Sequence, residues 1–310
     1  MEIIVDSYKS KVRIKNKLIC IEANENLKNE FSPLKVKKLL ISTHTTITGE
    51  VINTCIKHNI DLIFLDEYSN PISRIWNNKF GSISTIRRKQ IELFQTKIGY
   101  NLIINWQIEK IKNMFPFLDE NSKSKLNKYI TKIEKIDTNC NITLFRKQIL
   151  NYESKASNII FKNIIKLLSN DYRVQTREKK NATTPYNCIL NYSFAIIYNY
   201  LENELIKVGL DPSIGILHID NYNKKPLVYD LIEKYRYLGY KVSLKVVNTI
   251  AYSETNFIYK NNVLFLNKNI ILEIRKFMKI ELDKEQKNIK KYLHRITKSL
   301  LSGDINGLCC

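Results

Sequence analysis

A single carboxylate interrupts the apolar face of a predicted helix over residues 144–168. Glu153 shares this face with Ile149, Ala156 and Ile160, at helical spacing. A carboxylate in such surroundings loses hydration and needs a hydrogen-bond donor, a cation or a metal ion in compensation. The pattern leaves two simpler interpretations open, an edge position that reaches solvent or a salt bridge to one of the many lysines.

A histidine follows an apolar run just beyond the end of another predicted helix. Gly209 ends the helix predicted over 186–208, because a glycine there suits a left-handed cap, and His218 closes the run Ile214-Gly215-Ile216-Leu217. Histidine is a common metal ligand and a frequent acid or base, but a lone histidine is more often structural. His218 is therefore a candidate whose role its position does not decide.

Two further carboxylates, Asp230 and Glu233, lie one turn apart on a helix predicted to begin at Pro226. Proline suits the first helical position, where its missing N–H costs nothing. The two carboxylates share the face beside the apolar stripe, where a divalent cation could be held. Carboxylates at this spacing are also common on solvated helices, so the pair alone has low specificity.

Together these residues offer oxygen and nitrogen donors from separate segments. A glutamate, a histidine and a carboxylate on the next helix suit Mg²⁺ or Mn²⁺, the nitrogen donor making Mn²⁺ acceptable. Hard cations with open coordination positions serve phosphodiester chemistry, because they activate an attacking oxygen and screen charge on the phosphate. The sequence therefore predicts a divalent-metal site that works on an anionic substrate.

The balance of charge points to the class of that substrate. Fifty Lys and Arg oppose thirty Asp and Glu, which gives a formal net charge of +20. Such an excess raises the local concentration of polyanions and speeds their capture, so we expect DNA or RNA as a partner. A bias of composition is the simpler alternative, since the chain is also rich in Ile, Asn and Tyr and holds only eight Gly.

The elements that must position these residues fall into two regions. Residues 1–85 are predicted to form strands around one helix over 49–58, including a hairpin that turns at Asn16-Lys17. From residue 86 onward, long stretches have the 3.6-residue period of helices. The predicted fold class is α+β, with a small β-rich N-terminal domain (1–85) and a larger all-helical catalytic domain (86–310). Helices are predicted at 87–112, 122–136, 144–168, 186–208, 226–238 and 270–301, and further strands at 39–41, 62–65 and 72–76.

Cysteine spacing and hydropathy bound the cellular setting. The six cysteines are scattered, without a CxxC pair, which favours free thiols in a reducing compartment over disulfides or structural zinc. No stretch approaches the roughly 20 apolar residues that a membrane span needs. We therefore expect a soluble cytoplasmic protein.

Several short blocks resemble, in order and spacing, those of the CRISPR-associated integrases. The blocks are Glu153-Ser154-Lys155-Ala156, Asn187-Cys188-Ile189-Leu190-Asn191-Tyr192, Gly209-Leu210-Asp211-Pro212, Gly215-Ile216-Leu217-His218 and Tyr229-Asp230-Leu231-Ile232-Glu233-Lys234-Tyr235-Arg236. Proteins of this family capture foreign DNA fragments and insert them into a repeat array. The resemblance covers nearly the whole chain, and its most specific part runs from Asn187 to Arg236.

The resemblance implies roles for individual residues. Glu153, His218 and Glu233 take the positions of the family's Mg²⁺ or Mn²⁺ ligands, and Asp230 matches an acidic position beside the metal. All four are candidate catalytic residues. Arg236 is a candidate phosphate contact, or equally a salt-bridge partner of Asp230 or Glu233. Three more residues match the helix behind the site, and as buried polar groups they would hold helices in register: Asn187, Asn191 and Tyr192.

The resemblance also implies a reaction and its partners. The 3′-hydroxyl of a captured DNA fragment would attack a phosphodiester of the repeat array in a metal-dependent transesterification, and hydrolytic nicking would be the same chemistry with water. Apart from the resemblance, we expect a homodimer assembled through the N-terminal domain, because its strands leave edges that could pair with a second copy. A small second CRISPR adaptation protein would bridge two dimers.

The chain departs from the family pattern in four places. Ser154 stands where glycine is usual, Tyr237 stands where proline is usual, residues 173–185 match loosely, and the Cys309-Cys310 tail lacks an aromatic ending. None of these removes a ligand. They bear on DNA-end handling and repeat specificity more than on the chemistry.

Three other functions compete with this one. A non-catalytic nucleic-acid-binding protein would use the charge excess and the 18 Tyr for phosphate contacts and stacking, and would need no metal. An RNA-directed metal nuclease would share the site but differ in substrate. A helical scaffold protein would leave the clustered polar residues unexplained.

Overall fold

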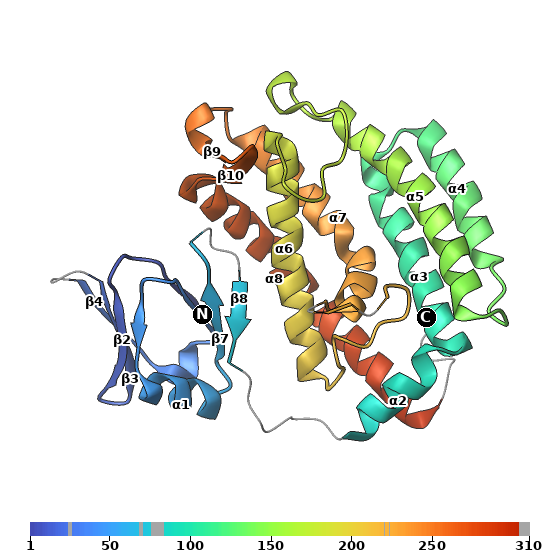
Figure 1. Ribbon diagram of the computed structural model, residues 1–310. Helices are drawn as coiled ribbons and strands as arrows, with labels where there is room; N and C mark the ends of the chain where they lie inside the picture. Colours follow the sequence, from blue (N-terminus) through green and yellow to red (C-terminus); the bar gives the residue numbers. More distant parts are fainter. Residues whose placement is uncertain (24–26, 68–70, 76–83, 220, 223, 304–310) are drawn as a thin grey trace. The chain divides into compact units, whose positions relative to one another are not determined.

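The computed structural model describes residues 1–23, 27–67, 71–75, 84–219, 221–222 and 224–303. The chain divides into two compact units, Met1–Phe80 and Gly81–Cys310, which are described separately below. The first is rich in strands and the second in helices (Figure 1). The predicted α+β fold, a strand-rich N-terminal region followed by a helical domain, is confirmed.

The N-terminal unit holds two sheets around a helix, α1 (Gly49–Lys57). One sheet has the order β1-β5-β7-β8, in which β1, β5 and β7 are parallel and β8 is antiparallel to β7. The other has the order β4-β3-β2-β6. The strands are β1 (Glu2–Val5), β2 (Lys11–Lys15), β3 (Leu18–Ala23), β4 (Leu27–Phe31), β5 (Lys38–Ile41), β6 (Thr46–Ile47), β7 (Asp61–Leu65) and β8 (Pro71–Arg74).

The predicted hairpin is the antiparallel pair β2–β3, and its turn is where the sequence places it. Asn16 and Lys17 have φ angles of 50° and 62°. Positive φ at both central residues is the geometry of the tight turns that match strand twist. The predicted strand over 72–76 corresponds to β8, although Trp76 lies outside the described residues.

The second unit is built from long helices around one apolar core. They are α2 (Ser84–Phe94), α3 (Lys97–Met114), α4 (Glu120–Glu134), α5 (Ile142–Lys166), α6 (Pro185–Lys207), α7 (Pro226–Thr249) and α8 (Lys268–Ser302). Figure 1 shows α3, α4 and α5 side by side, while α7 packs between α3, α6 and α8. The helix α7 is therefore central to the unit.

Two helix boundaries differ from the sequence expectation. The helix predicted over 87–112 is interrupted at Thr96, whose hydroxyl donates to Leu93 O and accepts from Ile98 N, so that α3 starts afresh with a capped end. Gly99 then packs so closely on the carbonyl of Phe94 that a Cβ there would lie 2.0 Å from its oxygen. The helix α7 also continues past the predicted end at residue 238, through Gly239.

The sequence predicts an all-helical domain over 86–310, but this unit also contains two strands. A hairpin of β9 (Phe257–Lys260) and β10 (Val263–Leu266) lies between α7 and α8. Asn261 and Asn262 turn it with φ angles of 51° and 58°. The hairpin attaches to the helical unit through the Leu264 N–H, which donates to the Ala182 carbonyl.

The described residues bear on two expectations, that the cysteines are free thiols and that the chain has no membrane span. Among the described residues, Cys20, Cys55, Cys140 and Cys188 are free thiols, while the Cys309-Cys310 tail lies outside them. In the same part of the chain, no helix has the length and apolar character to span a membrane.

The crossing of α6 and α7 depends on Gly239. A Cβ at this position would lie 2.5 Å from a ring carbon of Phe194. We expect Gly239→Ala to destabilise the helical unit by about 1–3 kcal/mol, because the overpacking outweighs the roughly 1 kcal/mol that alanine adds to a helix. Urea unfolding followed by circular dichroism measures this.

Two variants control this prediction. Gly49→Ala, where a Cβ meets nothing within 4 Å, should leave stability nearly unchanged. Combining Gly239→Ala with Phe194→Leu should cost less than the sum of the single changes, because the smaller side chain relieves the contact. Strictly additive losses would show that the ring contact is not the cause.

Candidate active site

A buried and a partly buried carboxylate from different helices meet at one lysine. Lys110 on α3 places its Nζ 2.5 Å from Glu153 Oε1 on α5 and 2.6 Å from Glu233 Oε2 on α7. The Lys110 and Glu233 side chains are only 5 % and 4 % exposed, and that of Glu153 is 21 % exposed. Buried charges of this kind persist only when they are paired. Lys110 therefore joins three helices at one point.

The surroundings of Glu153 are those that its spacing predicts. Ile149, Ala156 and Ile160 are buried on the same face of α5. Besides Lys110, Glu153 Oε1 accepts a hydrogen bond of 2.8 Å from Ser157 Oγ. A salt bridge to a lysine, one of the two simpler interpretations, is thus what the structure contains.

Glu233 has one satisfied and one unsatisfied oxygen. Its Oε1 accepts a 2.7 Å hydrogen bond from Arg236 Nε, one turn along α7. Its Oε2 is buried and, among the described residues, accepts no hydrogen bond, although the Lys110 ammonium is within ion-pair distance. The Lys110 ammonium, 2.6 Å away, is therefore the partner of this oxygen, chiefly through its charge.

The charges of this cluster reinforce one another. Burial acts to lower the pKa of Lys110, but the carboxylates of Glu233 and Glu153 outweigh it, and the pKa is raised. Burial acts to raise the pKa of Glu153, but Lys110 lowers it to about 2. The pKa of Glu233 is likewise lowered against its burial, by Arg236 and Lys110. Both carboxylates and their two cationic partners, Lys110 and Arg236, are therefore ionised near neutral pH.

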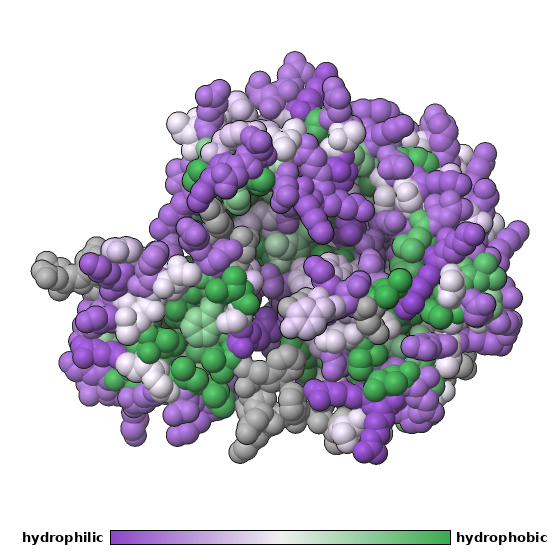
Figure 2. Space-filling view, in the orientation of Figure 1, coloured by the Kyte–Doolittle hydropathy of each residue, from purple (hydrophilic) through white to green (hydrophobic). Residues whose placement is uncertain are grey.

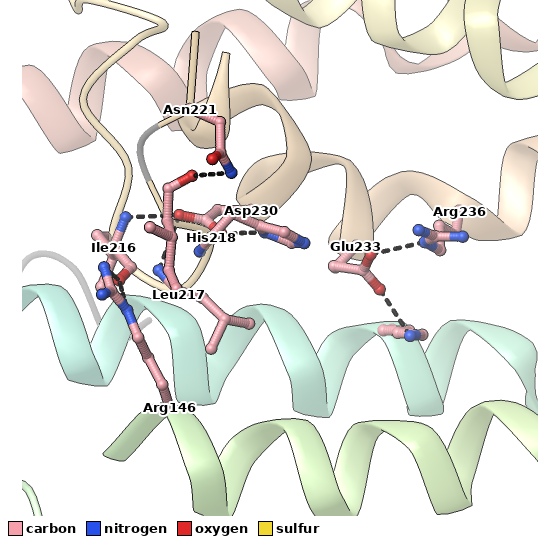
Figure 3. A network of polar contacts seen from close by, with 10 residues as sticks. Arg146, Ile216, Leu217, His218, Asn221, Asp230, Glu233 and Arg236 are labelled. Carbon is pink, nitrogen blue, oxygen red and sulfur yellow. Dashed lines mark hydrogen bonds and ion pairs between the residues drawn. The ribbon is translucent and has the colours of Figure 1, made fainter. Parts of the chain in front are cut away.

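Asp230 belongs to a second network, one turn before Glu233 (Figure 3). Its Oδ2 accepts from the backbone N–H groups of Ile216 (2.6 Å) and Leu217 (3.0 Å). Its Oδ1 accepts from the His218 N–H (3.0 Å) and lies 2.6 Å from His218 Nδ1. The side chain of Asp230 is fully buried, so it acts as an internal anchor for the segment that ends at His218.

Other elements support the same segment. Arg146 on α5 donates from Nε and Nη2 to the Ile216 carbonyl (Figure 3). Gln90 on α2 donates to the carbonyls of Asp211 and Ile214 and accepts from the Asp211 N–H. These bonds, with those to Asp230, give side-chain partners to backbone groups at both ends of residues 211–218 and fix the path of this segment.

Two glycines of this segment have different physical reasons, close packing at Gly215 and a left-handed backbone at Gly209. A Cβ at Gly215 would lie 2.5 Å from the Pro226 side chain, so only glycine fits. Gly209 has a φ of 87°, which confirms the left-handed cap predicted after α6.

His218 itself is half-exposed, with its side chain 39 % accessible. Because Asp230 engages Nδ1, Nε2 is the ring nitrogen left to meet a ligand or a proton. Figure 3 shows His218 and Asp230 facing one another, with Glu233 directed toward Arg236 and toward α3.

The structure therefore brings the candidate residues together in pairs. Glu153 meets Glu233 through Lys110, and His218 meets Asp230. Among the described residues, no group of three or more His, Cys, Asp or Glu side chains is close enough together to hold a metal ion. The expected set of Glu153, His218 and Glu233 is not assembled in this arrangement.

The residues behind the site have a different task from the one expected. Asn187 and Asn191 on α6 accept hydrogen bonds from Arg177, and Asn191 also donates to the Glu178 carbonyl. They therefore hold the segment before α6 in place. The sequence predicts instead that they hold helices in register. Tyr192 accepts from Arg275 Nε on α8, so this residue does connect two helices.

Arg236 and Ser154 can also be placed. Arg236 is the salt-bridge partner of Glu233, and its guanidinium lies 5.0 Å from the centre of the Phe194 ring. Ser154, the departure from the family pattern next to Glu153, is exposed. It therefore faces away from the carboxylate cluster.

Sequence reasoning missed Lys110, although a signal was present. Lys110 lies on the stripe of α3 that carries Ile103, Gln107 and Met114, all of them buried. A lysine on an apolar stripe needs a buried counter-charge, as Glu153 does. Pairing the two misplaced charges would have linked α3 with α5.

Comparison with known proteins gives a consistent family. The family described as CRISPR associated protein Cas1 matches residues 3–279. A protein of Archaeoglobus fulgidus named CRISPR-associated endonuclease Cas1 1 is 24% identical over 259 residues, covering 76% of this chain and 74% of that protein. One of Saccharolobus solfataricus, named CRISPR-associated endonuclease Cas1 2, is 26% identical over 235 residues, with shares of 76% and 71%.

Solved structures share the fold over almost the whole chain. A CAS1 protein from Thermotoga maritima superposes with a TM-score of 0.83 at 19% identity, covering 97% of both chains. A casposase bound to integration product gives 0.82 at 18% identity, covering 98% of this chain and 92% of that one. A chain of a Cas6-RT-Cas1–Cas2 complex gives 0.82 at 13% identity, covering 99% and 36%.

The role of Asp230 as an anchor can be tested directly. Asp230→Asn replaces one accepting oxygen by an amide nitrogen, so at least two of the contacts to residues 216–218 lose their acceptor. An unsatisfied buried donor costs about 1–3 kcal/mol. We expect protection of the Ile216, Leu217 and His218 amides from hydrogen exchange to fall by about tenfold or more, as measured by NMR or mass spectrometry.

Asp211→Asn serves as the matched control. Its Oδ1 accepts a single exposed hydrogen bond from the Ser213 N–H, so protection at 216–218 should stay unchanged. Full protection in Asp230→Asn would instead show that Arg146 and Gln90 hold the segment without the carboxylate.

Proposed function

The chain belongs to the CRISPR associated protein Cas1 family, whose match spans residues 3–279 of 310, and we propose that it is a DNA endonuclease and integrase of CRISPR adaptation. Two curated relatives are named endonucleases, and a similarly folded casposase was solved with an integration product. The observation that carries the proposal is the pair of carboxylates, Glu153 and Glu233, joined by Lys110, with Asp230 of the His218–Asp230 pair one turn earlier on α7.

These residues fit a divalent cation in their chemistry. Glu153 and Glu233 supply hard oxygen donors, and Glu233 Oε2 is a buried oxygen without a hydrogen bond among the described residues. His218 can add a nitrogen through Nε2. We propose that these three residues hold Mg²⁺ or Mn²⁺. A cation bound there would activate the attacking oxygen and neutralise charge that develops on the phosphate.

The remaining residues orient this set. Asp230 fixes the ring of His218 through Nδ1 and anchors the backbone before it. Arg236 engages Glu233 through Oε1, so Oε2, which faces Lys110, is the oxygen that would meet the cation. Outer partners of this kind set the direction and basicity of the ligands that they contact.

The proposed reaction is a transesterification. The 3′-hydroxyl of a captured DNA fragment attacks a phosphorus atom of the repeat array. One phosphorus–oxygen bond forms to the attacking oxygen, and the bond to the 3′-oxygen of the repeat strand breaks. The displaced 3′-oxygen takes up a proton, and the number of phosphodiester bonds is unchanged. The step therefore needs no external energy source. Nicking is the same displacement with water as the nucleophile.

DNA is the proposed substrate because of the charge. The net charge of +20 attracts a polyanion without regard to base sequence. On the face shown in Figure 2, hydrophilic residues cover most of the helical unit, with only small apolar patches between them. RNA would be attracted by the same charge, so a competition experiment between the two decides.

We propose two protein partners as well. A second copy would pair through the N-terminal unit, whose sheets end in edge strands such as β4 and β8. A small second adaptation protein of the Cas2 kind would bridge two such dimers. The similar fold found in a Cas6-RT-Cas1–Cas2 complex supports this second partner.

A strand-transfer assay tests the proposal. Glu153→Gln and His218→Ala should each reduce Mn²⁺-dependent nicking and strand transfer by more than about 100-fold, which exceeds the usual loss for an outer partner. DNA binding in low salt should remain, because it depends on Lys and Arg contacts to phosphates. The assay compares product formation and binding for each purified variant.

Surface variants of the same type control for general damage. Glu120→Gln removes a carboxylate whose side chain is 88% exposed, and His58→Ala removes an exposed histidine. Both should behave as the wild type. Wild-type activity in Glu153→Gln or His218→Ala, or activity in chelator, would contradict the proposal.

A second prediction separates the two carboxylates of α7. Glu233→Gln should abolish measurable Mn²⁺ binding in calorimetry, because it removes charge from the proposed ligand itself. Asp230→Asn should keep Mn²⁺ binding but lower turnover by roughly 10–100-fold, as expected for a residue that acts through His218. The opposite pattern would reverse the two roles.

A further inference from the structure

Lys110 places a permanent positive charge at the carboxylate pair. Its ammonium lies between Glu153 Oε1 and Glu233 Oε2, at 2.5 and 2.6 Å, and is screened from solvent. Lysine is rarely buried without a specific partner. In the metal-free protein, the two carboxylates therefore already share a cation.

The pairing is uneven. Glu153 Oε1 receives directed hydrogen bonds from Lys110 and from Ser157. Glu233 Oε2 receives charge from Lys110 but, within the described residues, no directed hydrogen bond. An oxygen held chiefly by charge loses little when one cation replaces another.

The charge of the cluster limits what can enter it. Glu153 and Glu233 carry two negative charges, and Lys110 and Arg236 carry two positive ones, so the cluster is neutral as it stands. A divalent cation added beside Lys110 would raise the net charge of this cluster from zero to +2 in a poorly hydrated site. The lysine stem has four flexible carbons and can move its head group without moving α3.

We propose that Lys110 is a positioning residue that acts as the internal counter-ion of the metal site. It keeps the carboxylates of Glu153 and Glu233 together in the metal-free protein, and its ammonium gives way to the divalent cation. It thereby lowers the affinity of the site for metal. This inference rests on the metal site of the proposed function.

Metal affinity tests the inference in the full-length protein. Lys110→Met keeps an unbranched side chain only one heavy atom shorter and removes its charge. Isothermal titration with MnCl₂ should show binding at least about tenfold tighter than in the wild type, because the repulsion by the ammonium is lost and Arg236 alone is left to compensate two carboxylates. In EDTA its melting temperature should fall, and saturating Mn²⁺ should raise it by more than it raises that of the wild type.

Three further variants complete the design. Lys110→Gln, also neutral but able to hydrogen-bond, should bind Mn²⁺ more tightly and serves if the methionine variant does not fold. Lys110→Arg keeps the charge and should bind no more tightly than the wild type. Lys241→Met removes a lysine that pairs with the buried carboxylate of Glu281, and should lower stability without changing Mn²⁺ affinity.

The outcomes separate the inference from the proposed function. If the wild type binds Mn²⁺, Glu153→Gln loses it, and neither neutral Lys110 variant binds more tightly, the counter-ion role is overturned while the metal site stands. If the wild type does not bind Mn²⁺, or Glu153→Gln binds it equally well, the proposed metal site is wrong and the role of Lys110 falls with it.

Discussion

The burial of two like charges at one place is the constraint that organises the helical unit. At about 4 Å and an effective dielectric constant near 20, two carboxylates repel by about 4 kcal/mol. Glu153 and Glu233 come from helices far apart in sequence, so they can be buried together only if cations accompany them. Lys110 and Arg236 do so from α3 and α7. The contact of α3, α5 and α7 at this depth depends on that neutralisation, since the apolar residues around it cannot compensate a charge.

A second constraint is the satisfaction of the backbone between α6 and α7. Residues 211–218 of this segment have no helix or strand of their own, so their N–H and C=O groups need side-chain partners. Gln90, Arg146 and Asp230 supply them from three different helices, and Gly215 allows the close approach to Pro226. The half-exposed His218 is thus the end of a well-supported segment and not a residue of a loose loop. Its direction is set by Asp230, which contacts both its ring and its backbone N–H.

The sequence predicted the long elements and the separate candidates better than their pairing. Helices α4, α5, α6 and α8 have strong 3.6-residue patterns, and their predicted bounds are within a few residues of those observed. The pattern did not reveal the break at Thr96, because a single polar capping residue barely alters a helical period. It also did not extend α7 through Gly239, where a glycine serves packing against Phe194 and not termination.

The same limit applies to the site. A carboxylate on an apolar face singles out Glu153, but a lysine on an apolar face does not stand out among fifty Lys and Arg. Lys110 is 43 residues from Glu153, and no local pattern joins them. Asp230 and Glu233 were expected to act side by side because they are three residues apart. In the fold they diverge, because each has its partners on a different side. Asp230 binds the backbone before His218, and Glu233 faces α3.

This divergence gives α7 its place in the architecture. The positions of Asp230 and Glu233 are separated by about 4.5 Å along the helix axis, at 1.5 Å per residue. A rigid helix therefore sets the spacing between the histidine segment and the carboxylate pair. Arg236, one turn further, reaches back to Glu233 and lies over Phe194 of α6. Because these three residues follow one another by single turns, a shift of α7 displaces both networks together. The two halves of the site cannot be adjusted independently, and the packing that fixes α7 against α3 and α6 is part of the chemistry it supports.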